Sequence, residues 1–463
     1  MSIRSQVILS QVNPPAQRSH VLVRQRVNAL LMNSLAYPLT LLHAGTGFGK
    51  TTAVLSFIQQ NPIQVFWYTV TPSEKDISRF LTYLASAFTQ DGMRIGGEAL
   101  RMLESGAAFQ DVLVALLNGM ARDIKGEALL VLDDFHHIRE ITGILEQVDW
   151  IIEHLPSRVH LLIATRRSVE FPSLNKWRAR GSLLEIGDRD LSFTHQEISD
   201  LFATQYTLSL EPKQVEQLFE RTEGWAIGLQ MVWQSLRSSP ERPFEGILRN
   251  EHEPRKALFA FLAEEVLDHI DSDQQQFLLK TSVLSVMDGE SCDFLLDRTD
   301  SGEVLNSLFK AGLFVDELHP GVYRYHHLFH EFLETRLAAA PWIVQTLHRK
   351  LASYFIANHF WERAIDHLVK AGDYHGLNQV LEQVGERLVG EGLHTSLLFW
   401  IDQVPQNMRL TFPFMQFLLG EVQRYTGHFE AALNHYHAAE DLYTQAGNRW
   451  GISKALRGQA QIY

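Results

Sequence analysis

The sequence predicts an α/β domain built on a parallel sheet, followed by a longer and mostly helical part. Over the first 190 residues, short apolar runs alternate with helical patterns such as the one at 77–89. The runs are apolar on both faces, which is typical of parallel strands that helices cover on both sides. The predicted strands are 39–43, 65–70, 129–133, 159–165 and 183–186. After Thr194 such strand signals nearly vanish.

The composition favours a globular protein of several domains. The chain has 463 residues, of which 45% are apolar and 21% charged, which disfavours both wholesale disorder and a membrane protein. A formal net charge of -13 without a long basic run disfavours nucleic-acid binding by this chain. A single cysteine, Cys292, excludes an internal disulfide. Because the first residues also lack the apolar core of a secretory signal, we expect a cytoplasmic location.

Helix-start signals organise the chain after the predicted sheet. Thr194, with Glu197 three residues later, predicts a capping box, and Asp271 predicts a second helix start. Between them, "SSPERPFEGILRNEHEPRK" combines prolines and charges and predicts a linker or an exposed loop. From about Trp342 onward the pattern predicts paired helices.

Residues 413–446 fit, in part, a helical-repeat template of about 34 residues. The matching positions are Leu419, Gly420, Ala432, Tyr436 and Ala439. The mismatches are Gln416, Gln423 and Thr444, which stand where the template has tryptophan, tyrosine and proline. The sequence stops inside a predicted repeat helix without a capping unit, so we expect the front part of a longer protein.

A glycine-rich loop joins the first predicted strand to a helix. "HAGTGFGKTT" matches the phosphate-loop pattern, with alanine in its first place. Glycines let successive backbone N–H groups surround an anion, and the helix that follows points its positive end at the same place. We therefore expect ATP or ADP to be bound by Ala44, Gly45, Thr46, Gly47, Phe48, Gly49, Lys50, Thr51 and Thr52. In this pattern Lys50 reaches the β and γ phosphates and Thr51 offers a hydroxyl to Mg²⁺.

Two further motifs are predicted to end at the same edge of the sheet. "ALLVLDDFHHI" predicts a buried strand that presents Asp133 as a ligand of Mg²⁺, directly or through water. Asp134 follows where many such ATPases carry a glutamate that orients the attacking water, and its shorter arm predicts slow turnover. With Lys50, these two carboxylates are the predicted catalytic residues. "VHLLIATRRS" ends in Arg166, a predicted sensor of the γ phosphate; a pair of surface arginines is the alternative.

Six motifs together resemble a known family. In chain order they are "HAGTGFGKTT", "LLVLDDFHHI", "LLIATRRS", "LLEIGDRDLSFTHQEISDLF", "RTEGWAIGLQMV" and "YRYHHLFHEFL". Their order and approximate spacing resemble the STAND class of signal-transduction ATPases, and within it the MalT-type large LuxR-family transcriptional activators. The resemblance extends over nearly the whole chain.

The resemblance implies a division of the chain into four parts. These are an AAA+-like P-loop nucleotide-binding domain at 1–190, a helical domain at 191–262, a winged-helix domain at 263–341 and, at 342–463, the first TPR-like repeats of a sensor solenoid. In such proteins the resting state holds ADP, and an inducer together with ATP opens the molecule into an oligomer.

The resemblance also implies roles for individual residues. Val23 and Arg24 would lie near the adenine through backbone contacts, and His326 would touch the β phosphate in the closed state. Ala226 and His327 stand where relatives carry proline, which leaves the local backbone there open. Since His326 and His330 are four apart, a metal site is an alternative, but no third ligand has suitable spacing, and a helix with solvated or packed histidines is the simpler reading.

These observations lead us to expect an ATP/ADP-dependent switch with slow ATP hydrolysis. An inducer would bind the helical repeats, self-association would follow ATP binding, and DNA would be bound only through a segment absent from this chain. One alternative is a nucleotide-dependent protein-interaction scaffold without DNA output. A P-loop metabolic kinase is another, although over half of the chain is helical sequence remote from the loop.

Overall fold

The computed structural model describes residues 7–16, 21–89, 95–238, 259–260, 263–264, 267, 270–310 and 314–462. The chain divides into two compact units. Unit 1 comprises Met1–Asp293 and Arg298–Arg336, and unit 2 comprises Phe294–Asp297 and Leu337–Tyr463.

Unit 1 contains the predicted parallel sheet. Its strands are β1 Leu39–His43, β2 Gln64–Thr69, β3 Ala128–Asp133, β4 Val159–Thr165 and β5 Leu183–Ile186. They lie in the order β2-β3-β4-β1-β5, with every paired neighbour parallel. The five predicted strands are confirmed, with one-residue shifts at β2 and β3. β1 lies between β4 and β5, so it is an interior strand of the sheet. The loop that follows its carboxyl end therefore has a neighbouring strand on each side.

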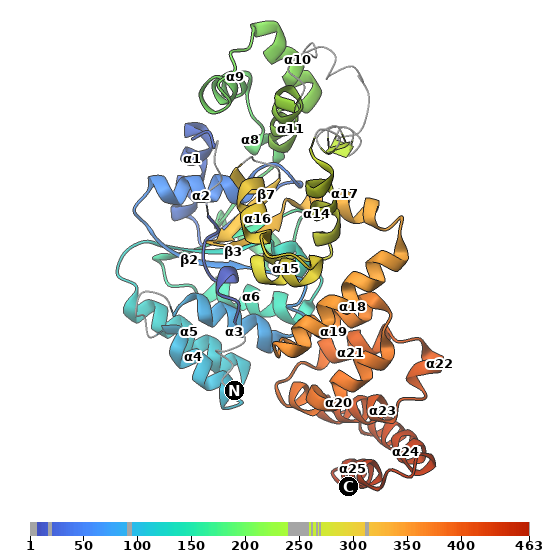
Figure 1. Cartoon of the computed structure of the whole chain (residues 1–463). Coiled ribbons are helices and arrows are strands. Elements are labelled where there is room, and N and C mark those ends of the chain that lie inside the picture. The colour runs from blue at the N-terminus through green and yellow to red at the C-terminus, as the bar shows by residue number, and fades with distance from the viewer. Residues whose placement is uncertain are drawn as a thin grey trace. The chain divides into compact units, whose positions relative to one another are not determined.

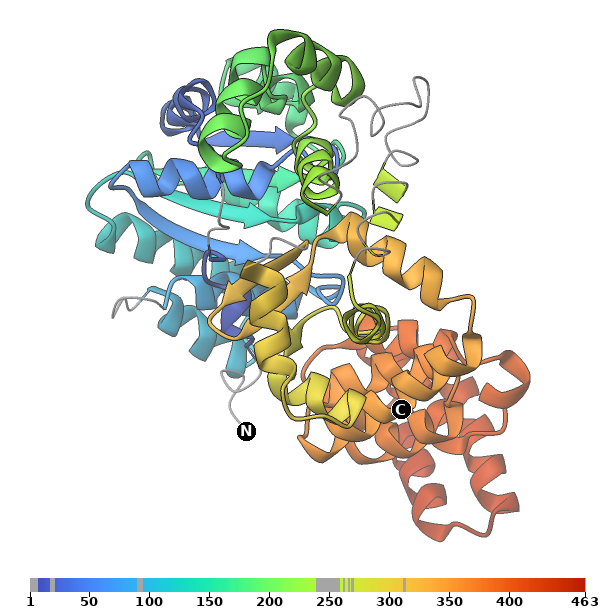
Figure 2. The same cartoon turned by 45° about the horizontal axis from the view of Figure 1, so that its top comes forward.

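Helices cover both faces of this sheet (Figure 1). They are α1 Gln25–Met32, α2 Lys50–Gln60, α3 Ile77–Ala87, α4 Ile95–Glu104, α5 Phe109–Asp123, α6 Thr142–His154 and α7 Leu174–Arg180. Both views place α1 and α2 on one face and α3 to α6 on the other (Figure 2). β3 shows why its sequence is apolar throughout: Leu130 and Leu132 join the core under α3 to α6, while Leu129 and Val131 are buried on the opposite face.

A helical segment follows the sheet. Its helices are α8 Asp188–Leu191, α9 His195–Asp200, α10 Pro212–Thr222 and α11 Ala226–Ser238, and a π turn at Leu201–Gln205 extends α9. The predicted capping box is confirmed, since Thr194 Oγ1 accepts from the Glu197 N–H at 3.2 Å and Glu197 Oε2 accepts from the Thr194 N–H at 3.1 Å. The predicted linker after Ser238 lies outside the described residues.

The rest of unit 1 combines helices with a small antiparallel sheet. The elements are α14 Ser272–Thr281, β6 Met287–Asp288, α15 Gly289–Leu296, α16 Ser301–Lys310, β7 Val315–His319, β8 Val322–Tyr325 and α17 His327–Leu337, of which the ends of α15 (from Phe294) and α17 (Leu337) belong to unit 2. The sheet order is β6-β8-β7. Asp271 caps α14 as predicted, because its Oδ1 accepts from the Gln274 N–H at 2.9 Å. The three strands were not read from the sequence, since they are short and alternate buried with partly buried residues.

Unit 2 consists of successive helices packed as neighbours. They are α18 Pro341–Ala357, α19 Trp361–Ala371, α20 Tyr374–Gly390, α21 His394–Asp402, α22 Gln406–Arg409, α23 Pro413–Tyr425, α24 Phe429–Gln445 and α25 Arg449–Ala460. The paired helices expected after Trp342 are confirmed. In the α23–α24 pair, Ala432, Tyr436 and Ala439 are fully buried, as the repeat template requires.

In the described ranges, no helix is long and apolar enough to cross a membrane.

Candidate functional site

The glycine loop lies between β1 and α2, where the sequence predicted it. Gly47 and Gly49 both have φ +80°, a conformation that favours glycine, and Gly49 immediately precedes α2. The backbone of residues 44–49 therefore turns at the carboxyl end of a central strand and opens onto a helix N-terminus. This arrangement fits an anion such as the phosphate chain of a nucleotide.

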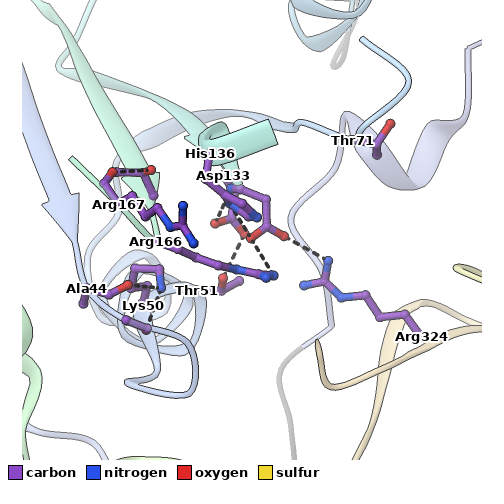
Figure 3. A network of polar contacts seen from close by, with 12 residues as sticks. Ala44, Lys50, Thr51, Thr71, Asp133, His136, Arg166, Arg167 and Arg324 are labelled. Carbon is purple, nitrogen blue, oxygen red and sulfur yellow. Dashed lines mark hydrogen bonds and ion pairs between the residues drawn. The ribbon is translucent and has the colours of Figure 1, made fainter. Parts of the chain in front are cut away.

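Lys50 opens α2 and folds back over the loop (Figure 3). Its Nζ donates to the carbonyl oxygens of Ala44 at 2.6 Å and Gly45 at 3.0 Å. Burial lowers the pKa of this ammonium to about 8, against the attraction of the Asp134 carboxylate. The ammonium thus lies at the loop and is bonded to two neutral carbonyl oxygens. A negatively charged phosphate oxygen would attract it more strongly than these carbonyls do.

Thr51 and Asp133 meet across the gap between α2 and β3 (Figure 3). The Thr51 Oγ1–H donates to Asp133 Oδ2 at 2.9 Å, and Asp133 Oδ1 accepts from the Asp134 N–H, also at 2.9 Å. Burial raises the pKa of Asp133, and the neighbouring Asp134 charge raises it further. A hydroxyl and a carboxylate in contact at the end of the loop are the oxygen ligands that Mg²⁺ accepts, so the residues present fit this ion.

Asp134 occupies a tight position directly after β3. Its backbone has φ +54°, which is uncommon for a residue with a side chain. Asp134 Oδ2 lies 3.3 Å from Arg324 Nη1, while Oδ1 lies 3.6 Å from Arg166 Nη2 and 3.8 Å from His136 Nδ1. Burial alone would raise the pKa of Asp134, but the two guanidinium groups outweigh it and lower the pKa. Burial lowers the pKa of His136 to about 3, so this ring is neutral near pH 7.

The arginine pair after β4 divides in two directions. The Arg166 side chain is partly buried and directed at Asp134, whereas Arg167 is exposed. The Arg167 carbonyl oxygen accepts from Thr165 Oγ1–H at 2.9 Å, which fixes the turn between them. The alternative of a surface pair therefore does not hold for Arg166. Its role as a phosphate sensor stays a prediction.

The segment before α1 packs against the segment that follows β5. Arg24 is buried, and its Nη1 donates to the Leu191 carbonyl oxygen at 2.5 Å while its guanidinium lies 4.2 Å from the Phe193 ring centre. Val23 is 38% exposed. From the same segment, Asp188 Oδ1 accepts from the Gly45 N–H at 2.7 Å. Arg24, one of the two predicted adenine residues, and Gly45 of the loop are thus both joined to residues 188–193.

The start of α11 contacts the loop directly, which the sequence analysis had not predicted. The Trp225 Nε1–H donates to the Thr46 carbonyl oxygen at 2.9 Å, and the Ile227 N–H donates to that of Gly47 at 3.0 Å. A Cβ on Gly47 would lie 2.4 Å from Ile227 Cγ2, so glycine is required by this packing as well as by φ. Phe48 is buried in the same loop. Trp225 lies within the motif "RTEGWAIGLQMV", but an indole donor facing a loop carbonyl has no sequence signature of its own.

His326 lies at the junction of β8 and α17. Its backbone N–H donates to the Phe314 carbonyl oxygen at 2.7 Å, and its own carbonyl oxygen accepts from the His330 N–H at 2.9 Å. The His330 Nε2–H donates to the Ser282 carbonyl oxygen at 2.6 Å, so this ring is engaged in packing. In the described part of the chain, no three His, Cys, Asp or Glu side chains are grouped as metal ligands. The contact of His326 with a phosphate stays a prediction.

Arg324 is a further residue of the site that the sequence did not predict. It comes from β8, and Figure 3 shows it extending from its own ribbon toward the carboxylates at the end of β3. The signal that identifies it is the alternation in "VYRY", where Tyr323 and Tyr325 are buried and Arg324 points the opposite way.

Comparison with protein families gives two matches. The first lies in unit 1, and the second extends a few residues beyond the end of unit 1. Residues 36–167 match the model described as "AAA domain", and residues 263–341 match "MalT winged helix domain".

Curated relatives have one description in common. The HTH-type transcriptional regulator MalT of Vibrio campbellii is 27% identical over 98% of this chain and 51% of its own length. Those of Vibrio cholerae and Cronobacter sakazakii are 28% and 29% identical over 83% and 81% of this chain, and 43% and 42% of their own lengths. The chain therefore spans about half the length of these relatives.

Among solved structures, a Signal Transduction ATPase with Numerous Domains (STAND) protein with a tetratricopeptide repeat sensor from Pyrococcus horikoshii is similar. The TM-score is 0.70, with 17% identity over 97% of this chain and 65% of that one. At this identity the likeness bears on the fold, and it agrees with a parallel-sheet domain followed by helical repeats.

The loop, the strand order and the carboxylate at the end of β3 define a P-loop protein of the AAA class. The match at 263–341 and the relatives narrow that class. The chain contains an AAA domain and a MalT winged helix domain, and it is similar to MalT-type regulators over most of its length.

Proposed function

We propose that this chain is the nucleotide-dependent switch of a MalT-like transcriptional regulator. The observation that carries the proposal is that two segments outside the α/β fold reach the glycine loop and its carboxylates: residues 225–227 at the start of α11 through Trp225 and Ile227, and β8 through Arg324. A change of phosphate state at the loop therefore has direct routes to both segments.

The predicted site residues take the following roles in this proposal. The backbone of 44–52 holds the phosphates, Lys50 neutralises the β and γ phosphates, and Thr51 with Asp133 holds Mg²⁺. Bound Mg²⁺ supplies positive charge to the phosphate oxygens. Asp134 orients water for slow hydrolysis, and Arg166 responds to the γ phosphate.

Further contacts complete the nucleotide site in this proposal. The backbone at Val23 and Arg24 lies along the adenine, and His326 touches the β phosphate in the ADP state. The division into 1–190, 191–262, 263–341 and 342–463 belongs to the same proposal. It makes the loop, α11, the winged helix and the repeats separate parts of one switch.

We propose DNA binding and inducer binding from the likeness to the relatives. Their name as HTH-type transcriptional regulators supports DNA binding by a segment outside these 463 residues. An inducer bound by the helical repeats would favour the ATP state, and self-association would follow. A protein-interaction scaffold without DNA output is the second candidate, and it shares the same site and repeats. The contacts of α11 and β8 with the site favour a switch over a metabolic kinase.

Binding and assembly measured on the same samples test the proposal. We expect calorimetry to detect both ADP and ATP with Mg²⁺, and light scattering to give a larger mass with ATP than with ADP once the inducer is present. Asp134→Asn should prolong the ATP-dependent mass because hydrolysis slows. A chain that binds neither nucleotide refutes the switch. Phosphate transferred to an added metabolite identifies a kinase instead.

A further inference from the structure

Arg324 is held in place by the strand that carries it. β8 is the middle strand of its sheet, pairing with β6 on one side and β7 on the other. Tyr323 and Tyr325, on either side of Arg324, are each 4% exposed, and Tyr325 Oη lies 2.6 Å from Thr281 Oγ1 on α14. Because side chains alternate along a strand, these buried tyrosines fix the direction in which Arg324 leaves the sheet.

The carboxylate that receives Arg324 is shared between two arginines. Arg324 Nη1 lies 3.3 Å from Asp134 Oδ2, and Arg166 Nη2 lies 3.6 Å from Asp134 Oδ1. The Asp134 and Arg324 side chains are 14% and 25% exposed, so water screens this pair incompletely. Each carboxylate oxygen thus faces a guanidinium group, one from the α/β fold and one from the small sheet.

Because of its backbone conformation, Asp134 depends on its arginine partners for its orientation. At φ +54° the residue is in a conformation that neighbouring structure must sustain. Its N–H donates to Asp133 Oδ1, so movement of Asp134 also affects the carboxylate that contacts Thr51. The proposed function makes Asp134 the acceptor that orients water, and an oxygen paired with Arg324 is a weaker acceptor for that water.

We infer that Arg324 is a positioning residue. By pairing with Asp134, it keeps this carboxylate from orienting the attacking water, so ATP hydrolysis accelerates when β8 moves away from the end of β3. This inference rests on the proposed function. It adds a specific atom pair, Arg324 Nη1 to Asp134 Oδ2, through which the small sheet controls turnover.

Three variants and one matched control test this pair. Arg324→Gln removes the charge, Arg324→Lys keeps a charge without the planar group, and Asp134→Asn removes the other partner. Arg298→Gln is the control, because Arg298 lies in the same part of the chain and pairs with Asp273 and Asp300. Both partners are exposed acids, unlike Asp134, so this variant removes an arginine ion pair that is not part of the site.

The first readout is hydrogen exchange of the ligand-free chain, followed by mass spectrometry. Arg324→Gln and Asp134→Asn should each speed exchange severalfold in peptides that cover 134–138 and 322–325, and the double variant should add little to either. Coupled residues give such non-additive effects. Arg298→Gln should leave both peptides unchanged. Additive effects, or no effect at 134–138, overturn the inference.

The second readout is single-turnover hydrolysis together with ADP affinity. Arg324→Gln should raise the hydrolysis rate about fivefold or more, the lower end of typical coupling between sites, with Arg324→Lys between it and the parent. A lower rate in Arg324→Gln would make Arg324 a phosphate ligand and overturn the inference while the switch survives. If the parent chain binds no nucleotide, the proposed function fails as well.

Discussion

At the scale of single residues, Lys50 is a buried ammonium to which the glycine loop offers only neutral carbonyl oxygens. Its ammonium donates to two carbonyl oxygens, and burial lowers its pKa to about 8. A buried cation gains most when an anion arrives, because the low local dielectric strengthens their attraction. The ammonium is therefore better placed to bind phosphate than to stabilise the fold.

Lys50→Ala should abolish most nucleotide affinity and leave the fold intact. Losing one partner of a buried charge pair costs about 2–5 kcal/mol, so we expect ADP affinity to fall roughly thirtyfold or more. Calorimetric titration measures the affinity, and circular dichroism measures the melting temperature. Lys176→Ala, at a 44% exposed lysine on α7, is the control and should bind normally. Equal affinity in both variants would remove Lys50 from the site.

Trp225→Phe tests the donor that joins α11 to the loop. The change keeps an aromatic ring but removes the Nε1–H that bonds to the Thr46 carbonyl oxygen. We expect a loss of about 1 kcal/mol in unfolding free energy, as for a typical hydrogen bond, and a severalfold loss of ADP affinity because the loop is less ordered. Chemical denaturation and calorimetry measure the two quantities.

Trp177→Phe provides the comparison for Trp225. Trp177 is buried on α7 and its Nε1–H donates to Glu153, so this variant also removes an indole hydrogen bond. It should lose stability while ADP affinity stays unchanged. A loss of affinity of the same size in both variants would show that general destabilisation, and not the loop contact, controls binding.

At the scale of elements, glycine decides how closely helices of unit 2 approach. A Cβ on Gly420 of α23 would lie 2.7 Å from the Tyr436 ring of α24, and Tyr436 is fully buried. The Tyr436 Oη–H donates to Glu421 Oε1 at 2.6 Å, which limits how far the ring can move. The repeat template places a small residue here because the helix pair closes over an aromatic ring.

Gly420→Ala should therefore destabilise unit 2 although alanine favours helices. Overpacking costs about 1–3 kcal/mol, which exceeds the gain of roughly 0.5–1 kcal/mol from replacing a helical glycine. Gly390→Ala in α20 is the control, since a Cβ there meets nothing within 4 Å. Thermal unfolding of the two variants measures the difference. Greater stability in Gly420→Ala than in Gly390→Ala would mean that the Tyr436 ring yields.

The elements also divide into those the sequence could predict and those it could not. The five parallel strands were predictable because each is an apolar run between helical patterns, and the loop was predictable because its glycines, Lys50 and Thr51 have fixed spacing. β7 and β8 were missed because four or five alternating residues give a weak signal. Arg324 was missed for the same reason, and because its partner Asp134 is 190 residues away.

Hydrogen bonds between distant segments were hidden from the sequence altogether. Trp225 bonds to a residue 179 positions earlier, and Asp188 bonds to Gly45 across 143 positions. Local patterns predict helices and strands, but such partners depend on how the segments pack. The sequence was therefore sufficient to locate the glycine loop between β1 and α2, whereas the contacts that join it to α11 and β8 required the structure.

At the scale of the whole molecule, each compact unit has its own apolar core, and the core of unit 2 contains a buried histidine pair. His348 on α18 and His367 on α19 are 6% and 9% exposed, and their Nδ1 atoms lie 2.8 Å apart. One ring must donate and the other accept, so the contact requires that at least one stays neutral. Burial lowers the pKa of His348 to about 4, and burial with the His348 charge lowers that of His367. Lys370 opposes protonation of both, and Arg363 opposes that of His367.

Mild acid should consequently destabilise unit 2. More than about one pH unit above 6.5, the ordinary pKa of histidine, both rings are neutral in the folded and the unfolded chain, so their contribution is constant. As the pH falls from 6.5 toward 4, the unfolded chain takes up protons that the folded pair rejects, and stability falls by up to about 1.4 kcal/mol per pH unit for each histidine. His348→Gln keeps a neutral polar group and should roughly halve this slope, whereas His437→Gln, at a 59% exposed ring, should not alter it. Hydrogen exchange of α18 and α19 peptides between pH 7 and 5, corrected for intrinsic rates, measures the slope, and equal slopes in the parent and His348→Gln would mean that acid acts elsewhere.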